Sequence, residues 1–256
     1  MSRVVAVTGS ASGIGAATAA LLRERGDRVI GVDRAGAGVD VVADLSTAPG
    51  RAEAVAAVTD LTGGVLDGLV TCAGLSRAGA PQVSVNYFGT TEVVDGLRPA
   101  LAASSAPRVA LVGSISAIQP HDAALVDACL AGDEPAALVL AEAALTDGRS
   151  HEIYSSTKAA LSRWLRRVSV TADFAGAGIA LNAIAPGVVL TPMTAELVSD
   201  PQWRQVMDRA VPMPLNGYAS PETIAYALAW LLSAENSHMA GQVVYVDGGA
   251  EALARP

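Results

Sequence analysis

A cluster of glycines between an apolar strand and an alanine-rich helix constrains this chain more than any other feature. The stretch 8–15, Thr-Gly-Ser-Ala-Ser-Gly-Ile-Gly, follows a predicted strand at 3–7 and precedes a helix that extends to Arg25. Glycines there allow a tight turn, close approach of the backbone to a pyrophosphate, and close packing of helix on strand, while the helix N-terminus favours negative charge. The pattern predicts a dinucleotide-binding turn, with a purely structural glycine turn as the alternative. Its candidate residues are Gly9, Ser12, Gly13, Ile14 and Gly15.

The rest of the chain repeats the order of strand, turn and helix. Further strands are predicted at 28–32, 39–43, 66–71, 108–112, 179–184 and 242–246, and further helices at 50–61, 83–97, 152–174 and 220–232. Strands that alternate with helices require crossover connections and a parallel sheet. We therefore expect a single α/β domain over 1–256, built on a Rossmann-type doubly wound parallel sheet with helices on both faces.

Two segments interrupt this order. Residues 119–149 form an insertion-like segment, rich in Ala, Leu, Asp and Glu, in which we expect one or two helices. Residues 191–216 carry four prolines and the side chains of Met193, Met207 and Trp203. Because methionine fits irregular surfaces, we expect a pliable, irregular substrate lid there. The alternative is that these side chains only pack the domain.

Composition excludes several classes of protein. The chain is 51% hydrophobic but only 4% aromatic, as in helices packed on both faces of a buried parallel sheet. No apolar run approaches the roughly 18 residues needed to cross a bilayer, and a net charge of −8 argues against nucleic acid or an anionic membrane as partner. Cys72 and Cys129 suit neither a disulfide framework nor a metal site, and the histidines are scattered. We expect no metal and, since the start lacks a secretory signal, a cytoplasmic location.

Lys158 is the only lysine among 17 basic residues, and it follows Tyr154 by four positions. On a helix, positions i and i+4 share a face, so the phenol and the ammonium can point into one site. A nearby cation lowers the phenol pKa from about 10, and a lysine can release a proton whereas an arginine cannot. The pair predicts a tyrosine that acts as general acid or base. The alternative is a solvated lysine beside an interfacial tyrosine.

Asp33 ends the second predicted strand, where an acidic residue receives the adenosine ribose hydroxyl in such folds. A carboxylate at this place would repel a 2′-phosphate, so we expect NAD(H) to be preferred over NADP(H). Arg34 follows immediately and partly offsets that repulsion. An ordinary loop residue at the end of a strand is the alternative.

Together these residues resemble the short-chain dehydrogenase/reductase family, and the resemblance covers the whole chain. The glycine turn at 8–15 and Tyr-x-x-x-Lys at 154–158 are its two signatures. Residues 43–51, 67–75 and 83–89 are similar to the bacterial 3α-hydroxysteroid dehydrogenase/carbonyl reductase branch. So is the long stretch between Ser114 and Tyr154.

The resemblance implies further cofactor-binding residues. Asp44 and Leu45 match the pair that holds the adenine ring, and Pro186, Val189 and Thr191 match the segment that binds the nicotinamide carboxamide. A strand-end motif is matched by Ala73 and Gly74, and departs from the family where Thr71 and Cys72 replace two asparagines. That departure weakens a strand-stabilising role more than a catalytic one.

The resemblance also implies a catalytic set, which consists of Asn86, Ser114, Tyr154 and Lys158. Tyr154 would donate a proton to a carbonyl oxygen that Ser114 holds, and Lys158 would grip the nicotinamide ribose. Asn86 would hold a water on a proton path. Ser116 is the competing candidate for the serine.

The expected function is that of an NAD(H)-dependent enzyme interconverting a hydrophobic, cyclic secondary alcohol and its ketone. Alternatives are a short-chain reductase of a terpenoid, sugar or acyl-thioester-linked ketone, and a non-catalytic dinucleotide-binding protein. Relatives assemble through the helices that carry Asn86 and Tyr154. Because the insertion enters just before Tyr154 and would cover that surface, we expect a homo-oligomer, with a dimer favoured over a tetramer.

Overall fold

The fold is built on one parallel sheet whose strands are apolar on both faces. The computed structural model describes residues 2–256, apart from the side chains of residues 196 and 197. The strands are β1 (Val4–Thr8), β2 (Arg28–Asp33), β3 (Val41–Val42), β4 (Gly68–Thr71), β5 (Arg108–Val112), β6 (Ala180–Pro186) and β7 (Val243–Val246). Their order is β3-β2-β1-β4-β5-β6-β7, so the chain winds outward in both directions from the pair β1 and β4. In such sheets ligands bind at the carboxyl ends of the strands, beside this reversal.

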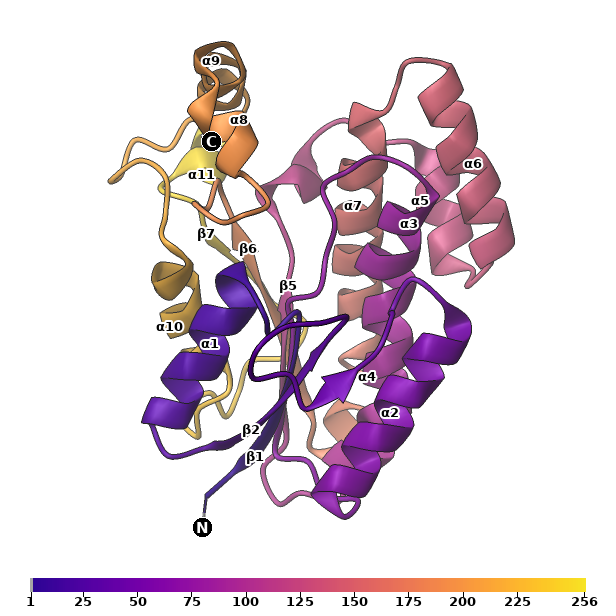
Figure 1. Ribbon diagram of the computed structural model, residues 1–256, viewed down its shortest axis with the longest axis vertical. Coiled ribbons are helices and arrows are strands. Elements are labelled where there is room, and N and C mark those ends of the chain that lie inside the picture. The colour runs from indigo at the N-terminus through magenta and orange to yellow at the C-terminus, as the bar shows by residue number, and fades with distance from the viewer. Residues whose placement is uncertain (1) are drawn as a thin grey trace.

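Helices cover both faces of the sheet, which confirms the predicted doubly wound fold. On one face α1 packs against α10, and α2, α4 and α7 cover the other (Figure 1). The helices are α1 (Gly13–Glu24), α2 (Ala48–Thr62), α3 (Ala80–Val83), α4 (Gly89–Ala102), α5 (Ala123–Leu130), α6 (Glu134–Thr146), α7 (His151–Val168), α8 (Ala195–Ser199), α9 (Pro201–Ala210), α10 (Pro221–Leu231) and α11 (Ala250–Ala254). A π-helical turn, Ser84–Phe88, joins α3 to α4.

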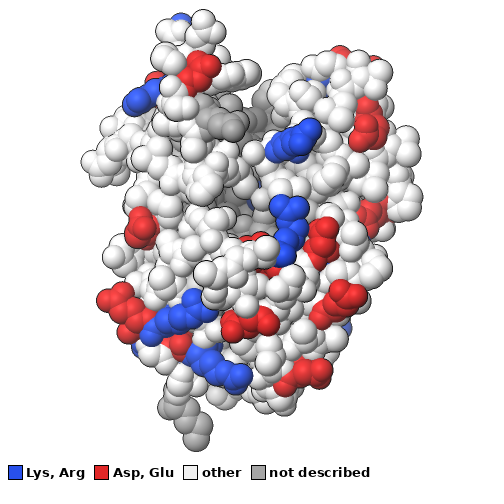
Figure 2. Space-filling view, in the orientation of Figure 1, with Lys and Arg blue, Asp and Glu red and all other residues white. Residues whose placement is uncertain are grey.

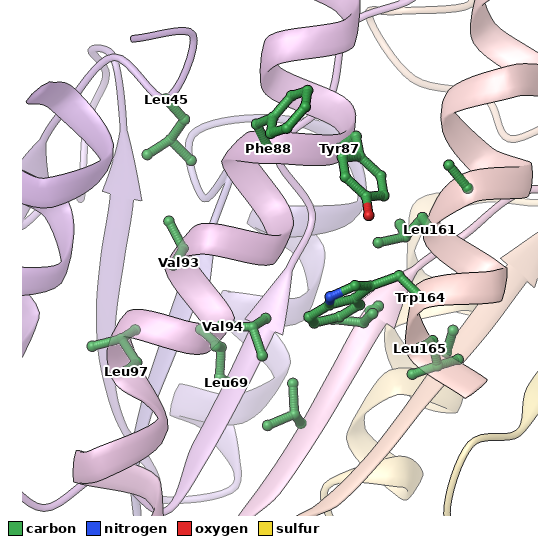
Figure 3. Packing of buried hydrophobic residues seen from close by; sticks show 14 of the residues in the cluster. Leu45, Leu69, Tyr87, Phe88, Val93, Val94, Leu97, Leu161, Trp164 and Leu165 are labelled. Carbon is green, nitrogen blue, oxygen red and sulfur yellow. The ribbon is translucent and has the colours of Figure 1, made fainter. Parts of the chain in front are cut away.

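The larger hydrophobic core lies between the sheet and the helices α4 and α7. Figure 3 shows Val94 of α4 on the side of Leu161 and Trp164 from α7, whereas Val93 and Leu97 point to the other side of α4. All five side chains are nearly or fully buried. Because a close-packed core resists displacement of either helix, this packing fixes α7 relative to the π-helical turn.

Several predicted boundaries are wrong. Where one helix was expected at 83–97, the structure has α3, the π-helical turn and then α4, which ends at Ala102. The strand expected at 39–43 is reduced to Val41–Val42. The Gly31 N–H of β2 donates to the carboxylate of Asp40 at 2.7 Å, and so is not available to a backbone carbonyl of a longer neighbouring strand. The helix expected at 152–174 ends at Val168. There the N–H and the hydroxyl of Thr171 both donate to the Val168 carbonyl, at 3.0 and 2.7 Å, and close a turn.

The insertion-like segment forms two helices, α5 and α6, as expected. Helix α5 lies against α7, and α6 packs on α5 and α3 (Figure 1). A buried arginine ties the segment to the rest of the domain: Arg51 of α2 forms ion pairs with Glu92 of α4 at 2.7 Å and with Glu134 of α6 at 2.5 Å. The insertion is therefore anchored beside the loop that follows β3.

The lid segment is not irregular as predicted, because it contains the helices α8 and α9. The side chain of Asp200 accepts hydrogen bonds from the N–H groups of Gln202 and Trp203, at 2.8 and 3.3 Å, and Pro201 occupies the first turn. An aspartate cap followed by proline is a strong helix start. Proline here begins a helix, whereas the sequence interpretation treated the prolines as signs of irregular structure.

Candidate functional site

The glycine turn connects β1 to α1, and each of its glycines is required for a different reason. Gly9 has a φ of +69°, and a Cβ there would lie 2.7 Å from the Ala73 nitrogen. Gly13 has a φ of +51° and leaves room for the side chain of Thr191, whose Cγ2 would be 3.2 Å from a Cβ. At Gly15 a Cβ would lie 2.1 Å from the Gly9 carbonyl oxygen, an impossible approach. The turn is therefore closed by backbone contacts.

The first turn of α1 can receive an anion. Ser12 is its N-cap residue, yet the Ser12 side chain makes no capping hydrogen bond. The first N–H groups of a helix have no partner within the helix, and the helix dipole adds partial positive charge. The turn thus fits the pyrophosphate of a dinucleotide, which would take these donors.

Two carboxylates follow at the next strand ends. The Asp33 carboxylate accepts the Ala11 N–H at 3.0 Å and the Arg34 N–H at 2.7 Å. The Asp44 carboxylate accepts the Ser46 N–H at 2.9 Å. Hydrogen bonds from Ser46, and the charge of Arg34, hold the pKa of Asp44 below its usual value. Asp33 is thereby fixed against the glycine turn, at the end of the sheet where an adenosine would lie.

A cavity of about 710 Å³ runs from this end toward α7 and the lid. It brings together every predicted site residue except Asn86. Those that line it are Gly9, Ser12, Gly13, Ile14, Gly15, Asp33, Asp44, Leu45, Ala73, Gly74, Ser114, Tyr154, Lys158, Pro186, Val189 and Thr191. In Figure 2 the hollow on this face lies among uncharged groups, with basic side chains at its right-hand margin.

Ser114 and Tyr154 meet inside the cavity. Ser114 follows β5 in an extended conformation, and the interaction of its hydroxyl with that of Tyr154 lowers the pKa of the phenol. The Ser114 oxygen also accepts the Ser116 N–H at 3.1 Å, because Ser116 lies in the short helical turn that Ser114 caps. Both serines line the cavity, but the contact with Tyr154 belongs to Ser114.

The pKa of Tyr154 moves in the direction opposite to the one expected from the sequence. Burial raises the pKa of the phenol, and the hydrogen bond with Ser114 opposes this effect. The Lys158 nitrogen lies 5.7 Å from the centre of the Tyr154 ring. Tyr154 is therefore held as a neutral phenol that can donate a proton near neutral pH.

Lys158 is buried without a carboxylate, being only 5% exposed. Its ammonium donates to the Val112 carbonyl at 2.9 Å, at the end of β5. Burial lowers the Lys158 pKa to about 8. A group that exchanges its proton so near neutral pH could not be replaced by a guanidinium, which stays charged.

Asn86 does not line the cavity, and it is fully buried in the π-helical turn. Its side chain accepts the Leu75 N–H at 2.7 Å and donates to the Leu75 carbonyl at 3.0 Å. Both ends of the amide are thus engaged with the loop after β4, which contains the cavity-lining Ala73 and Gly74. Asn86 fixes the shape of that loop.

Thr71 and Cys72 stand where the family motif has two asparagines, and neither takes over the polar contacts of an asparagine side chain in this structure. The buried Thr71 hydroxyl has no hydrogen-bond partner among the described residues. Cys72 lines the cavity near Lys158, and burial raises the pKa of its thiol to about 12, so the thiol is un-ionised. Neither residue contributes charge to the site.

Sequence reasoning missed much of the opposite end of the cavity. Its walls there include Ile115, Gln119, Met207, Ala210 and Val211, which come from the turn after β5, the start of the insertion and the end of the lid. Only the methionines of the lid gave a signal for this apolar end. Gln119 and Ala210 carried none, because their place depends on how two distant loops meet.

Within residues 2–256, with the side chains of 196 and 197 set aside, no three histidine, cysteine, aspartate or glutamate side chains are placed to hold a metal ion. In the same part of the chain, no helix has the length and apolar character to span a bilayer.

The relationship to known proteins agrees with this geometry. A family model described as enoyl-(acyl carrier protein) reductase matches residues 9–251. The chain is 36% identical over 260 residues to the 3-alpha-hydroxysteroid dehydrogenase/carbonyl reductase of Comamonas testosteroni, covering 99% of this chain and 98% of the relative. It is 34% identical to the cis-4-hydroxycyclohexanecarboxylate dehydrogenase of Sinomonas cyclohexanicum, covering 98% of this chain and 97% of the relative.

A solved structure is similar over nearly the same length. The crystal structure of the 3-alpha-hydroxysteroid dehydrogenase from Pseudomonas sp. B-0831, complexed with NADH, matches with a TM-score of 0.91 and 46% identity, covering 99% of this chain and 98% of that one. The chain belongs to the short-chain dehydrogenase/reductase family. The resemblance to the hydroxysteroid dehydrogenase branch is likewise confirmed.

Proposed function

We propose that this protein is an NAD(H)-dependent oxidoreductase that interconverts a hydrophobic, cyclic secondary alcohol and its ketone. One observation carries the proposal: Ser114, Tyr154 and Lys158 converge in a cavity whose other end holds the glycine turn and Asp33. A binding protein needs only the second group of residues. Relatives that share nearly the whole chain are named for hydroxysteroids, carbonyl compounds and a hydroxycyclohexanecarboxylate.

The chemistry divides between bound cofactor and protein. NAD(H) supplies the hydride when it is bound. Tyr154 donates its proton to the carbonyl oxygen of the ketone, and Ser114 holds that oxygen by a hydrogen bond where negative charge develops. Lys158, with its pKa near 8, returns a proton to Tyr154 by way of a hydroxyl or water between them. Asn86 acts at one remove, as a positioning residue for the loop after β4.

We propose that the coenzyme preference rests on Asp33. Its fixed carboxylate would accept a ribose hydroxyl and would repel a 2′-phosphate. The affinities for NADH and NADPH, measured by nucleotide fluorescence, test this assignment. In Asp33→Ser the ratio of the affinity for NADH to that for NADPH should fall about tenfold. No change in the ratio would refute the assignment of Asp33.

The reaction class is tested with Tyr154→Phe and a set of ketones. Monocyclic ketones, steroid ketones, a terpenoid ketone and an acyl-thioester-linked ketone are offered with NADH, and its oxidation is followed by absorbance. We expect reduction of the cyclic apolar ketones, and a loss of about 10²- to 10⁴-fold in the variant. NADH binding should stay near that of the unaltered protein. Turnover in Tyr154→Phe close to that of the unaltered protein would defeat the proposal.

Assembly and location are part of the same proposal. Helices α5 and α6 lie against α7 and α3, and the family resemblance implies assembly through the helix that carries Tyr154, which is α7. We propose a dimer, to be tested by sedimentation at several concentrations, with a tetramer as the contrary result. The free thiols of Cys72 and Cys129 suit a reducing compartment such as the cytoplasm.

A further inference from the structure

A second cavity, of about 340 Å³, lies beside the first one. It is enclosed by the turn after β5, the end of the lid and the short C-terminal helix α11. The two cavities share Ile115, Gln119 and Ala210 in their walls. Since Ile115 directly follows Ser114, the second cavity begins close to the reacting end of the first.

One hydrogen bond joins two of the residues that line both cavities. The side-chain amide of Gln119, at the start of the insertion, donates to the Ala210 carbonyl at the end of α9, at 3.3 Å and in contact with solvent. A long, exposed, neutral hydrogen bond contributes little to stability. A ligand that extends along the cleft can displace it without disturbing the fold on either side.

The second cavity differs from the first in charge. Apart from Gln119, its walls are apolar residues, among them Ile118, Pro212 and Leu253, and two arginines, Arg209 and Arg255. Among the described residues that line it none is acidic, although the chain as a whole has a net charge of −8. A local excess of positive charge in an acidic protein favours an anionic ligand.

The two arginines are not equivalent. Arg255 pairs with Glu251 at 2.5 Å and lies over the Tyr245 ring, so its charge is already compensated. No ion pair or hydrogen bond of the Arg209 guanidinium occurs within the described residues. Arg209 lies in the last turn of α9, where the helix dipole favours a cation. The dipole alone does not explain why this side chain lines a cavity.

We propose that the substrate cleft continues past Gln119 into the second cavity, and that Arg209 there receives an acidic group at the far end of the substrate. The inference rests on the proposed function. The substrate class it defines is a rigid, apolar ring body that carries the reacting ketone or alcohol at one end and a carboxylate at the other. Arg209 is then a specificity-determining residue, separate from the groups that perform the reaction.

The test compares Arg209→Gln with Arg166→Gln. Arg166 is exposed on α7 and lines neither cavity, so its substitution makes the same change in charge elsewhere. The substrates are a ring ketone with a remote side-chain carboxylate, for example a 3-ketosteroid acid, and its methyl ester. We expect KM for the acid to rise about fivefold in Arg209→Gln, with kcat and the kinetics of the ester unchanged. Arg166→Gln should alter neither substrate.

Failure of the inference can be told apart from failure of the proposed function. If the ester and the acid are both reduced, and Arg209→Gln leaves their KM ratio unchanged, the anionic subsite is refuted and the reductase remains. If no ketone is reduced by the unaltered protein, the proposed function falls and the inference with it. Reduction of the ester by Arg209→Gln also shows that the variant is folded.

Discussion

The two ends of the main cavity are built by different means. At the cofactor end the wall formed by the glycine turn is backbone, and the contacts at Gly9 and Gly15 leave no space for a single added carbon. At the substrate end the walls are side chains from the lid and the insertion, which meet in the exposed hydrogen bond between Gln119 and Ala210. The first end therefore admits one shape, whereas the second can be reshaped without unfolding the sheet.

This difference means that the substrate end can change while the cofactor end keeps its shape. The glycine turn follows β1 and Asp33 ends β2, and these two strands pair with each other inside the sheet. The helices α8 and α9 are additions above its carboxyl edge (Figure 1). If the contacts decide the outcome, substitutions at the cofactor end should reduce binding or activity strongly, and substitutions at the substrate end should not.

The largest effect is expected where the two ends meet, at Lys158. In Lys158→Arg the charge remains but can no longer be released, and the guanidinium must fit a buried site closed by the Val112 carbonyl. We expect kcat to fall by about 10²- to 10⁴-fold. Steady-state kinetics with the best ketone from the panel measure this. The reverse exchange on the exposed face of the same helix, Arg166→Lys, is the matched control, and activity retained in both would remove Lys158 from the mechanism.

Gly15→Ala should cause the next largest loss, and at the cofactor end alone. The added Cβ would lie 2.1 Å from the Gly9 carbonyl, so the turn must move. Overpacking of this kind costs about 1–3 kcal/mol, which corresponds to NADH binding weakened about 5- to 150-fold if the loss falls on the bound state. Nucleotide fluorescence measures the affinity.

Gly176→Ala provides the control for that substitution. A Cβ at Gly176 meets its nearest atom at 3.5 Å, an ordinary contact, and the residue is remote in sequence from the turn. Its NADH affinity should equal that of the unaltered protein. If Gly15→Ala also bound NADH as tightly as the unaltered protein does, the cofactor end would not be rigid. The contrast between the two ends would then be wrong.

The buried ammonium of Lys158 should also make stability depend on pH. The unfolded lysine keeps its proton to about pH 10.5, whereas the folded one releases it near pH 8. Below pH 8, burial of the charge therefore lowers the free energy of unfolding by its full amount. Above pH 10.5 this effect is gone, because the lysine is then neutral in both states. Across that window the free energy of unfolding should rise by about 3 kcal/mol in the unaltered protein relative to Lys158→Met. Subtraction of the variant removes the titration of other groups.

Urea denaturation of both proteins at pH 7.5 and pH 10 measures this difference. The variant should be the more stable of the two at pH 7.5, and the gap should close at the higher pH. A gap that is independent of pH would mean that Lys158 keeps its ordinary pKa in the folded protein.

The cofactor end could be predicted from the sequence because its residues act through local backbone geometry. Glycine at 9, 13 and 15 and aspartate at 33 have meaning within a strand, a turn and a helix that are contiguous in the chain. Tyr154 and Lys158 could be paired for the same reason, since one helical turn separates them. The lining of the cavity includes all of these residues.

The remainder depended on contacts between distant segments. The side chain of Asn86 was expected at the catalytic site, but it bonds to Leu75, a partner that no periodicity reveals. The direction of the Tyr154 pKa shift could not be predicted, because burial of the phenol, which outweighs the opposing interaction with Ser114, arises only once the domain has closed around it. The lid was expected to be irregular, since the Asp200 cap was not recognised among its prolines.

The smallest effect is expected from Gln119→Ala, which removes the bridge between insertion and lid. A bond of this length and exposure contributes at most about 1 kcal/mol, so neither NADH affinity nor the unfolding midpoint should change measurably. KM for a long ketone that reaches the second cavity should fall by about two- to threefold, because no bond must be broken to admit it. KM for a monocyclic ketone should stay the same. A loss of NADH affinity as large as that in Gly15→Ala would mean that the substrate end is coupled rigidly to the cofactor end.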